Sequence, residues 1–89
     1  MTNLSKTRDR FNNPLKIGDW VSVVKQGTLN CQIDMVGYIG IIEEIGENDT
    51  GGVAQVNCAN NGCGAIETNC LKKVGEPSTE IKYLKGFLS

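Results

Sequence analysis

Four cysteines, Cys31, Cys58, Cys63 and Cys70, are the side chains of this sequence with the most distinctive chemistry. Thiolates can hold a metal ion, close a disulfide or act as nucleophiles. Structural zinc sites usually take cysteines in pairs about two to four residues apart. Here 26, 4 and 6 residues lie between successive cysteines, and the chain has no histidine. We therefore expect no metal site and no cofactor.

Other catalytic combinations are missing from the sequence. Without histidine, the commonest general base is absent. Glu43 and Glu44 are neighbours on an expected strand, so their carboxylates should point to opposite faces and should not act together. Gly37 and Gly40 belong to the same strand and lack the Lys-Ser or Lys-Thr of a phosphate-binding loop. We therefore expect a protein that is not an enzyme.

The strand that carries these residues organises the chain. Residues 35–45 are rich in β-branched and aromatic side chains, which is typical of a strand. If Ile42 faces the core, Gly40 also does so and lets neighbouring strands approach. The same alternation turns Ile39 and Ile41 outward.

Further strands are expected on both sides of this one. The alternation breaks at Ile45, which predicts a bulge near Glu43 and Glu44, and residues 46–52 collect the Gly, Asn and Asp of an exposed turn. The other expected elements follow from alternation and turn residues. They are a strand over 15–24 with Val21 and Val23 inward and Trp20 and Ser22 outward, a long loop over 25–35, a hairpin of 53–58 and 63–67, a single helical turn at 68–70 and a closing strand at 71–74.

Both ends of the chain differ from this body. Residues 1–14 are polar and basic without an apolar period, so we expect a flexible arm. The C-terminal residues can form a short helix capped by Ser78 or Thr79. Its apolar stripe would consist of Ile81, Leu84 and Leu88. The expected organisation is an arm over 1–14, a barrel domain over 15–75 and a tail over 76–89.

The order and spacing of these elements resemble the SH3-like small barrels. The resemblance is carried by Gly18-Asp19-x-Val21-x-Val23, Gly37-x-x-Gly40-x-Ile42, the hairpin and Leu71-x-x-Val74. This broad group includes the KOW modules of ribosomal and transcription factors, a small barrel protein of photosystem I, the variable chain of ferredoxin-thioredoxin reductase and small phage-encoded barrels. The resemblance implies an all-β, five-stranded barrel over residues 15–75 and assigns no active residues.

In a barrel of this kind, the cysteines would form two local pairs. Cys58 and Cys63 would face each other at the base of the hairpin, and Cys31 and Cys70 would lie in a loop and a turn that come together. A thiol-based redox response is therefore one alternative function. A cytoplasmic protein normally keeps such thiols reduced, and free thiols that serve as small apolar side chains are the favoured interpretation.

Charge is distributed unevenly along the chain, although the net charge is only −1. Residues 1–16 have a net charge of +3, residues 17–71 of −6 and residues 72–89 of +2. An acidic body repels a phosphate backbone, so nucleic acid is a disfavoured partner. The alternative is a KOW-like nucleic-acid binder that uses the basic ends. Its contacts would be Lys6, Arg8, Arg10, Lys72 and Lys73.

An apolar patch is the candidate binding surface. Trp20, Ile39 and Ile41 are all expected to face outward, with Tyr38 close by. A patch of this kind on a small domain usually contacts something. Its occupant can be the apolar stripe of the tail, a second copy of the chain or a different protein.

The sequence contains no apolar stretch long enough to span a membrane, and its first residues lack the apolar run of a signal peptide. We therefore expect a cytoplasmic protein without a membrane partner. The favoured function is a non-enzymatic interaction or accessory module whose partner is another protein, with homodimerisation as a further possibility.

Overall fold

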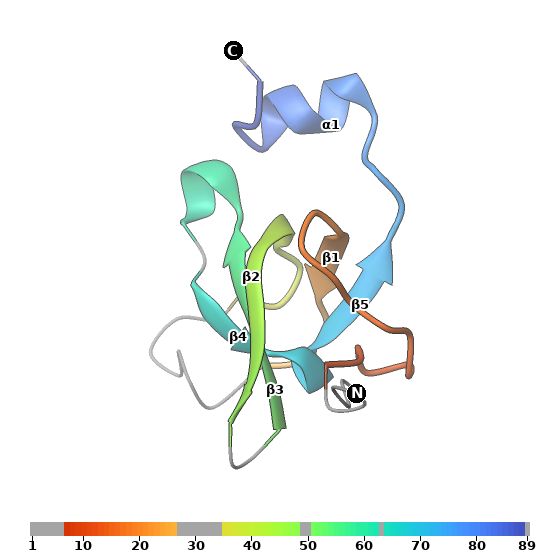
Figure 1. Cartoon of the computed structure of the whole chain (residues 1–89). Helices are drawn as coiled ribbons and strands as arrows, with labels where there is room; N and C mark the ends of the chain where they lie inside the picture. Colours follow the sequence, from red (N-terminus) through yellow and green to blue (C-terminus); the bar gives the residue numbers. More distant parts are fainter. Residues whose placement is uncertain (1–6, 27–34, 49–50, 63, 89) are drawn as a thin grey trace.

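A five-stranded antiparallel sheet forms the body of the protein in the computed structural model, which describes residues 7–26, 35–48, 51–62 and 64–88. The strand order is β4-β3-β2-β1-β5. The edge strands β4 and β5 follow each other in the chain through the turn η2, so the sheet curls back on itself (Figure 1). In chain order the elements are β1 Trp20–Val23, β2 Ile39–Asn48, β3 Gly51–Asn57, η1 Ala59–Asn61, β4 Ala65–Glu67, η2 Thr68–Cys70, β5 Leu71–Val74 and α1 Thr79–Leu84.

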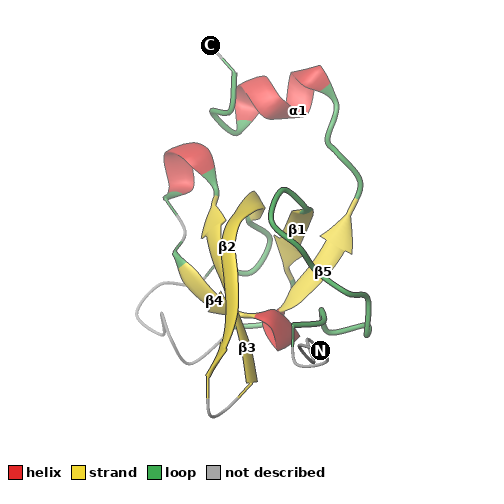
Figure 2. Cartoon of the chain, in the orientation of Figure 1, coloured by secondary structure: helices red, strands yellow, loops and turns green. Residues whose placement is uncertain are grey.

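The expected all-β fold class is confirmed. Strands make up the body of the molecule, and the short helix α1 lies at one end of it (Figure 2). In β1, Val21 and Val23 are buried whereas Trp20 and Ser22 are half-buried on the other face, as the alternation predicts. The buried core takes side chains from every strand. It consists of Leu15, Val21, Val23, Met35, Ile42, Ala54, Val56, Cys58, Ile66, Cys70 and Leu71.

The central strand β2 follows its predicted parity but begins later than predicted. Ile42 is 1% exposed and belongs to the core. Gly40 also faces inward, and a Cβ atom there would lie 2.6 Å from Val56 Cγ1 and 2.7 Å from the carbonyl oxygen of Asn57. The strand begins at Ile39 instead of residue 35, because the preceding residues form a turn in which the amide of Tyr38 donates to the carbonyl of Met35 over 3.0 Å.

The predicted bulge is present between Ile42 and Glu44. Glu43 and Glu44 were expected on opposite faces of the strand. The extra residue of the bulge instead leaves both of them exposed. Beyond the bulge, β2 and β3 pair as far as Asn48 and Gly51. The exposed turn predicted over residues 46–52 is therefore largely strand, and residues 49 and 50 lie outside the described part of the chain.

The hairpin predicted from residues 53–67 is confirmed. Strands β3 and β4 pair with Val53 opposite Glu67 and Gln55 opposite Ala65. Their connection is longer than predicted because β3 ends at Asn57 and β4 starts at Ala65. The Asn57 side chain accepts a hydrogen bond of 2.8 Å from the Ala59 amide at its start. The helical turn η2 and the closing strand β5 lie where they were predicted.

The prediction of a flexible arm over residues 1–14 is wrong for residues 7–14. Thr7 is 2% exposed and Asp9 is 5% exposed. The Arg10 amide donates to the carbonyl of Leu71 over 2.8 Å, and the Lys73 amide donates to the Asp9 carboxylate over 2.7 Å. We call residues 7–14 the N-terminal segment. Hydrogen bonds hold this segment along β5. The folded body therefore includes residues 7–14 and does not begin at residue 15. Residues 1–6 lie outside the described part.

Candidate functional site

The predicted apolar patch is partly assembled by the sheet. Trp20 on β1 is the register partner of Ile41 on β2, and Ile39 is the register partner of Ser22. All of these side chains are half-buried on the outer face of the sheet. Tyr38 behaves differently, because it packs against the buried core. The patch is therefore a strip of Trp20, Ile39 and Ile41 without Tyr38.

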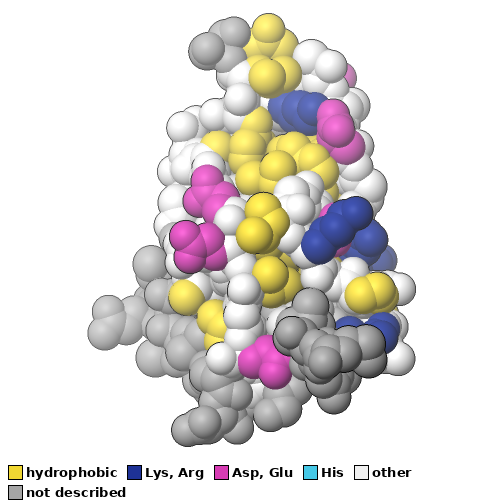
Figure 3. Space-filling model, viewed as in Figure 1, with side chains coloured by type: hydrophobic (Ala, Val, Ile, Leu, Met, Phe, Trp, Pro, Cys, Tyr) yellow, Lys and Arg dark blue, Asp and Glu magenta, His cyan; other side chains and the backbone are white. Residues whose placement is uncertain are grey.

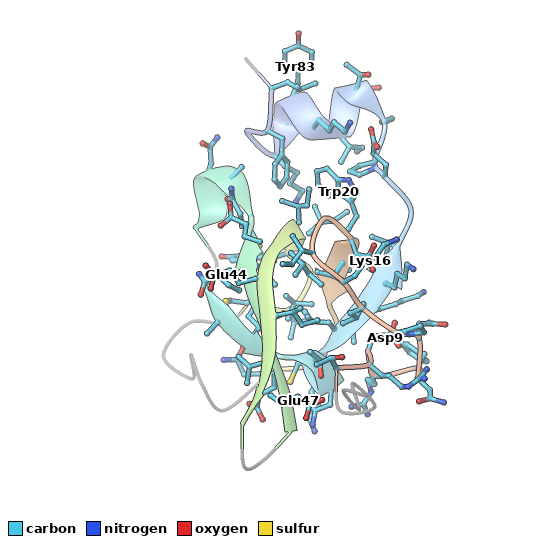
Figure 4. All side chains as sticks on the ribbon, viewed as in Figure 1. Asp9, Lys16, Trp20, Glu44, Glu47 and Tyr83 are labelled. Carbon is cyan, nitrogen blue, oxygen red and sulfur yellow. The ribbon has the colours of Figure 1, made fainter. Side chains whose placement is uncertain are left out.

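The C-terminal tail covers this strip at Trp20. The Trp20 and Phe87 rings meet edge to face, with centroids 4.9 Å apart and an interplanar angle of 76°. The ammonium group of Lys82 lies 5.7 Å from the centroid of the Trp20 ring, which is within the range of a cation–π contact. Trp20 lies between the sheet and α1 (Figure 4). Of the three occupants considered from the sequence, the structure places the tail of the same chain on the patch.

The residues that form this contact differ from the predicted stripe. Ile81 is 38% exposed, Leu84 is 73% exposed and Leu88 is 40% exposed, so none of them is buried against the sheet. The stripe prediction assumed a helix that continues to residue 88, whereas α1 ends at Leu84. Phe87, which sequence reasoning missed, makes the contact instead. Gly86 was the available signal, because a glycine near a helix end often reverses the chain.

Two local motifs set the position of the tail. At the start of α1 the Ser78 hydroxyl accepts a hydrogen bond of 3.3 Å from the Ile81 amide, which confirms one of the two predicted caps. At its end the Gly86 amide donates to Tyr83 and the Phe87 amide donates to Lys82. With Gly86 at a φ of +86°, this is the Schellman pattern, which turns Phe87 back toward Trp20.

A further contact joins the tail to the hairpin. The Asn60 amide in η1 donates to the Lys85 carbonyl over 3.4 Å. Gly86 has a φ of +86°, which favours glycine, and a Cβ atom there would displace the Asn60 side chain, whose nitrogen would lie 2.3 Å away. The tail is thus held at two places, by Trp20 and by η1.

The tail presents its remaining apolar side chains to solvent. We call this surface the tail face, and its members are Ile81, Tyr83, Leu84 and Leu88, which are all exposed. Tyr83 points away from the sheet (Figure 4), and hydrophobic side chains are visible both on α1 and directly beneath it (Figure 3). Four of the seven large apolar side chains that are exposed in the described residues belong to this short segment. Such clustering marks a contact surface more than scattered single side chains do.

The cysteines divide into two chemical states. Cys58 is disulfide-bonded, and its partner lies outside the described residues, as Cys31 and Cys63 do. The favoured interpretation of reduced thiols is therefore wrong for Cys58. Cys70 is a free, buried thiol, so the second predicted pair does not form at this residue. Burial raises the pKa of the Cys70 thiol and the nearby Glu67 carboxylate adds to this effect, which makes a poor nucleophile.

A shallow groove lies on the β2–β3 hairpin. Its cavity volume is about 390 Å³, and Glu44, Ile45, Gly46, Glu47, Val53, Gln55 and Ala65 line it. Glu43 lies outside the groove and accepts a hydrogen bond of 3.4 Å from the Asn57 amide group. Both neighbouring carboxylates are thus exposed, but only Glu44 lines the groove.

Within the described ranges, no group of three or more His, Cys, Asp and Glu side chains is placed to hold a metal ion. None of the helices in these ranges has the length and apolar character needed to cross a bilayer. Comparisons with protein-family models, with curated proteins and with solved structures found no match to this chain. The resemblance to SH3-like barrels therefore stays a prediction, while the all-β fold is confirmed.

Proposed function

We propose that this protein is a non-enzymatic interaction module that binds another protein through the tail face. The observation that carries this proposal is the division of the tail into an inner and an outer side. Phe87 and Lys82 attach the inner side to Trp20, and Leu84 and Tyr83 on the outer side stay exposed. Burying these outer side chains against a partner would remove apolar surface from water, which favours association.

The tail face is held in place before any partner arrives. A six-residue helix is too short to be stable by itself in water. Here the Ser78 cap, the Schellman turn and the contact with Trp20 stabilise it. Because the segment is already ordered, a partner does not have to supply the free energy that ordering it would cost.

The size of the tail face favours a different protein over a second copy as the occupant. A stable dimer usually buries about 800 Å² on each chain and uses about 20–30 residues a side. Four side chains on one short helix form a much smaller surface. A short helix of this kind can fill a groove on a different protein, whereas two copies would bring together two small helical surfaces and no groove.

The absence of a catalytic combination in the sequence supports a binding role, as does the resemblance to small barrels that serve as platforms. A cytoplasmic location is part of the proposal. The disulfide at Cys58 is more typical of an oxidising compartment, so a cell-fractionation measurement is the check on this part.

Site-specific photocrosslinking tests the binding surface. A photoreactive phenylalanine analogue is placed at position 84 on the tail face or, as the control, at Ile17, an apolar side chain outside the tail that is 61% exposed. In cells that produce the protein, position 84 should yield a discrete adduct that contains a second protein, and position 17 should not. An adduct composed only of this chain would contradict the proposal and indicate a homodimer. Equal adducts from both positions would also contradict it.

A substitution gives an independent check. For this check the crosslinker is placed at position 88, and Leu84→Ser is combined with Tyr83→Ser. The double variant should yield about tenfold less of the adduct, because two apolar contacts of a few tenths to about 1.5 kcal/mol each are lost. Ile17→Ser should leave the yield unchanged. An unchanged yield in the double variant would contradict the role of the tail face.

A further inference from the structure

The N-terminal segment brings basic residues from the two ends of the sequence together. The hydrogen bonds from Arg10 to Leu71 and from Lys73 to Asp9 place this segment beside β5. Arg10 therefore lies next to Lys72, although they are far apart in the chain. We call this surface the basic face. Its members are Arg8, Arg10, Phe11 and Lys72, and Lys16 and Lys73 lie beside Asp19 at its border. Most Lys and Arg side chains visible in Figure 3 lie along this edge of the molecule.

The acidic groups within the basic face are already engaged. Asp9 is 5% exposed, and its carboxylate accepts hydrogen bonds from the amides of Phe11, Asn13 and Lys73. Asp19 is also buried and pairs with Lys73 at 3.7 Å. The charges displayed to solvent on this face are therefore mainly positive. In Figure 4, Glu44 points to the side of β2 opposite Lys16.

An exposed aromatic ring stands among these cations. Phe11 is 59% exposed, and the ammonium group of Lys72 lies 5.8 Å from its ring centroid. The Phe11 amide is held by the Asp9 carboxylate at 2.8 Å, so the backbone beneath the ring is fixed. An exposed aromatic ring held beside cations can stack on a flat ligand while the cations contact negative charges on the same ligand.

We propose that the basic face binds a short stretch of single-stranded nucleic acid, with Phe11 stacking on one base and the neighbouring cations contacting phosphates. Unpaired bases expose the flat surface that an aromatic side chain needs, whereas a duplex hides it. The face has no helix that could enter a major groove, which disfavours readout of duplex DNA. The acidic residues of β2 would repel a strand beyond this face, so the bound stretch would be short.

This inference revises the expectation that nucleic acid is a disfavoured partner. That expectation averaged the charge along the sequence and treated residues 1–14 as a free arm. The docked N-terminal segment instead forms a fixed surface with β5. The proposal does not depend on the tail face, because α1 and the N-terminal segment lie at different ends of the molecule (Figure 1).

Fluorescence anisotropy with a labelled oligothymidylate of about 15 nucleotides tests the proposal. The full chain should bind this probe, and the logarithm of the association constant should fall steeply as the logarithm of the salt concentration rises. Phe11→Ala should weaken binding about tenfold, the effect expected from the loss of one stacked base. Tyr83→Ala removes an equally exposed aromatic ring from the tail face and should leave the affinity unchanged.

The role of the cations is tested by the salt dependence. Lys72→Gln should reduce the slope of that dependence by about 0.7, the contribution of one phosphate contact on a single strand. Lys85→Gln makes the same charge change in the tail and should not alter the slope. No binding of the oligothymidylate by the wild-type chain would overturn the proposal, and so would equal binding by Phe11→Ala.

Two further probes distinguish other anionic ligands. Heparin carries charge without bases, so its binding should not respond to Phe11→Ala, and duplex DNA should bind at least about tenfold more weakly than the single strand. If heparin or vesicles with anionic lipid bind as tightly as the oligothymidylate, and Phe11→Ala affects none of them, the face is a general anion surface and the proposal is wrong.

Discussion

Asp9 is the residue that fixes the N-terminal segment. Its carboxylate receives hydrogen bonds from Phe11 and from the amide and side chain of Asn13, and it also receives one from Lys73, which is 64 positions away. Burial by itself would raise the pKa of Asp9, but these hydrogen bonds lower it further than burial raises it. The pKa in the folded protein therefore lies below its usual value of about 3.9.

We predict that Asp9→Asn lowers the free energy of unfolding by about 1–3 kcal/mol at neutral pH, because an amide cannot accept all of these bonds. A lowered folded-state pKa means that the carboxylate stabilises the fold above its unfolded-state pKa and loses this effect as the pH falls through the folded-state pKa. Urea unfolding at pH 7 and at lower pH measures the difference between wild type and variant, which should shrink in acid.

Glu47→Gln is the matched control for Asp9→Asn, because Glu47 is an exposed carboxylate on β2. It should change the free energy of unfolding by less than about 0.5 kcal/mol at either pH. A difference between wild type and Asp9→Asn that stays constant from neutral pH to strong acid would contradict the assigned role of the Asp9 carboxylate.

Gly40 tests the close approach of β2 and β3. A Cβ atom there would lie 2.7 Å from a backbone oxygen and 2.9 Å from Cys58 Sγ, and neither atom is the end of a flexible side chain. We predict that Gly40→Ala lowers the free energy of unfolding by about 1–3 kcal/mol through overpacking. Gly46→Ala on the same strand meets nothing within 4 Å and should be nearly neutral or slightly stabilising. Equal stability of the two variants in urea unfolding would contradict this packing.

At the scale of elements, the tail shows how a short helix is attached by residues outside it. α1 spans Thr79–Leu84, but the aromatic contact with the sheet is made by Phe87, three residues beyond its end. The Schellman turn at Gly86 makes this possible, because it reverses the chain and returns the aromatic ring to Trp20. The helix itself is left with its apolar side chains outward.

We predict that Phe87→Ala loosens the tail. An edge-to-face aromatic pair contributes about 0.5–1.5 kcal/mol beyond the area that it buries, and a marginal six-residue helix depends on it. Trp20 is the single tryptophan of the chain, so its emission reports directly on this contact. The emission maximum should move to longer wavelength in Phe87→Ala, while the far-ultraviolet signal of the sheet is kept. Leu84→Ala, which changes a 73% exposed side chain, should leave the emission at the wild-type position. Identical spectra for wild type and Phe87→Ala would show that the tail does not rest on this ring pair.

At the scale of the whole molecule, the elements that the sequence predicted correctly share a local signal. The parity of β1, the inward position of Gly40, the bulge and the β3–β4 hairpin all follow from alternation or turn residues within a few positions. The fold class is thus accessible from neighbouring residues, whereas the strand order, with β1 beside β5, depends on distant pairings. Boundaries were less accurate, as the late start of β2 and the long connection before β4 show.

The features that the sequence did not predict depend on contacts between distant residues. The N-terminal segment has no apolar period, and Asp9 holds it to a strand that comes much later in the chain. The basic face exists only because of this docking. The position of Phe87 depends on where α1 ends, and the disulfide of Cys58 depends on a pairing that spacing leaves open. Of the predicted patch residues, Trp20 and Ile41 lie together and the tail covers Trp20, while their role in binding a partner stays a prediction.

The docked N-terminal segment also protects the protein from aggregation with other copies of itself. β5 is an edge strand, and an uncovered edge invites another chain to add a strand and begin aggregation. Arg10 and Asp9 occupy the Leu71 carbonyl and the Lys73 amide that such an incoming chain would use. A shortened version that starts at Leu15 would expose this edge of β5. It should form soluble oligomers or precipitate under conditions in which the full chain stays in solution.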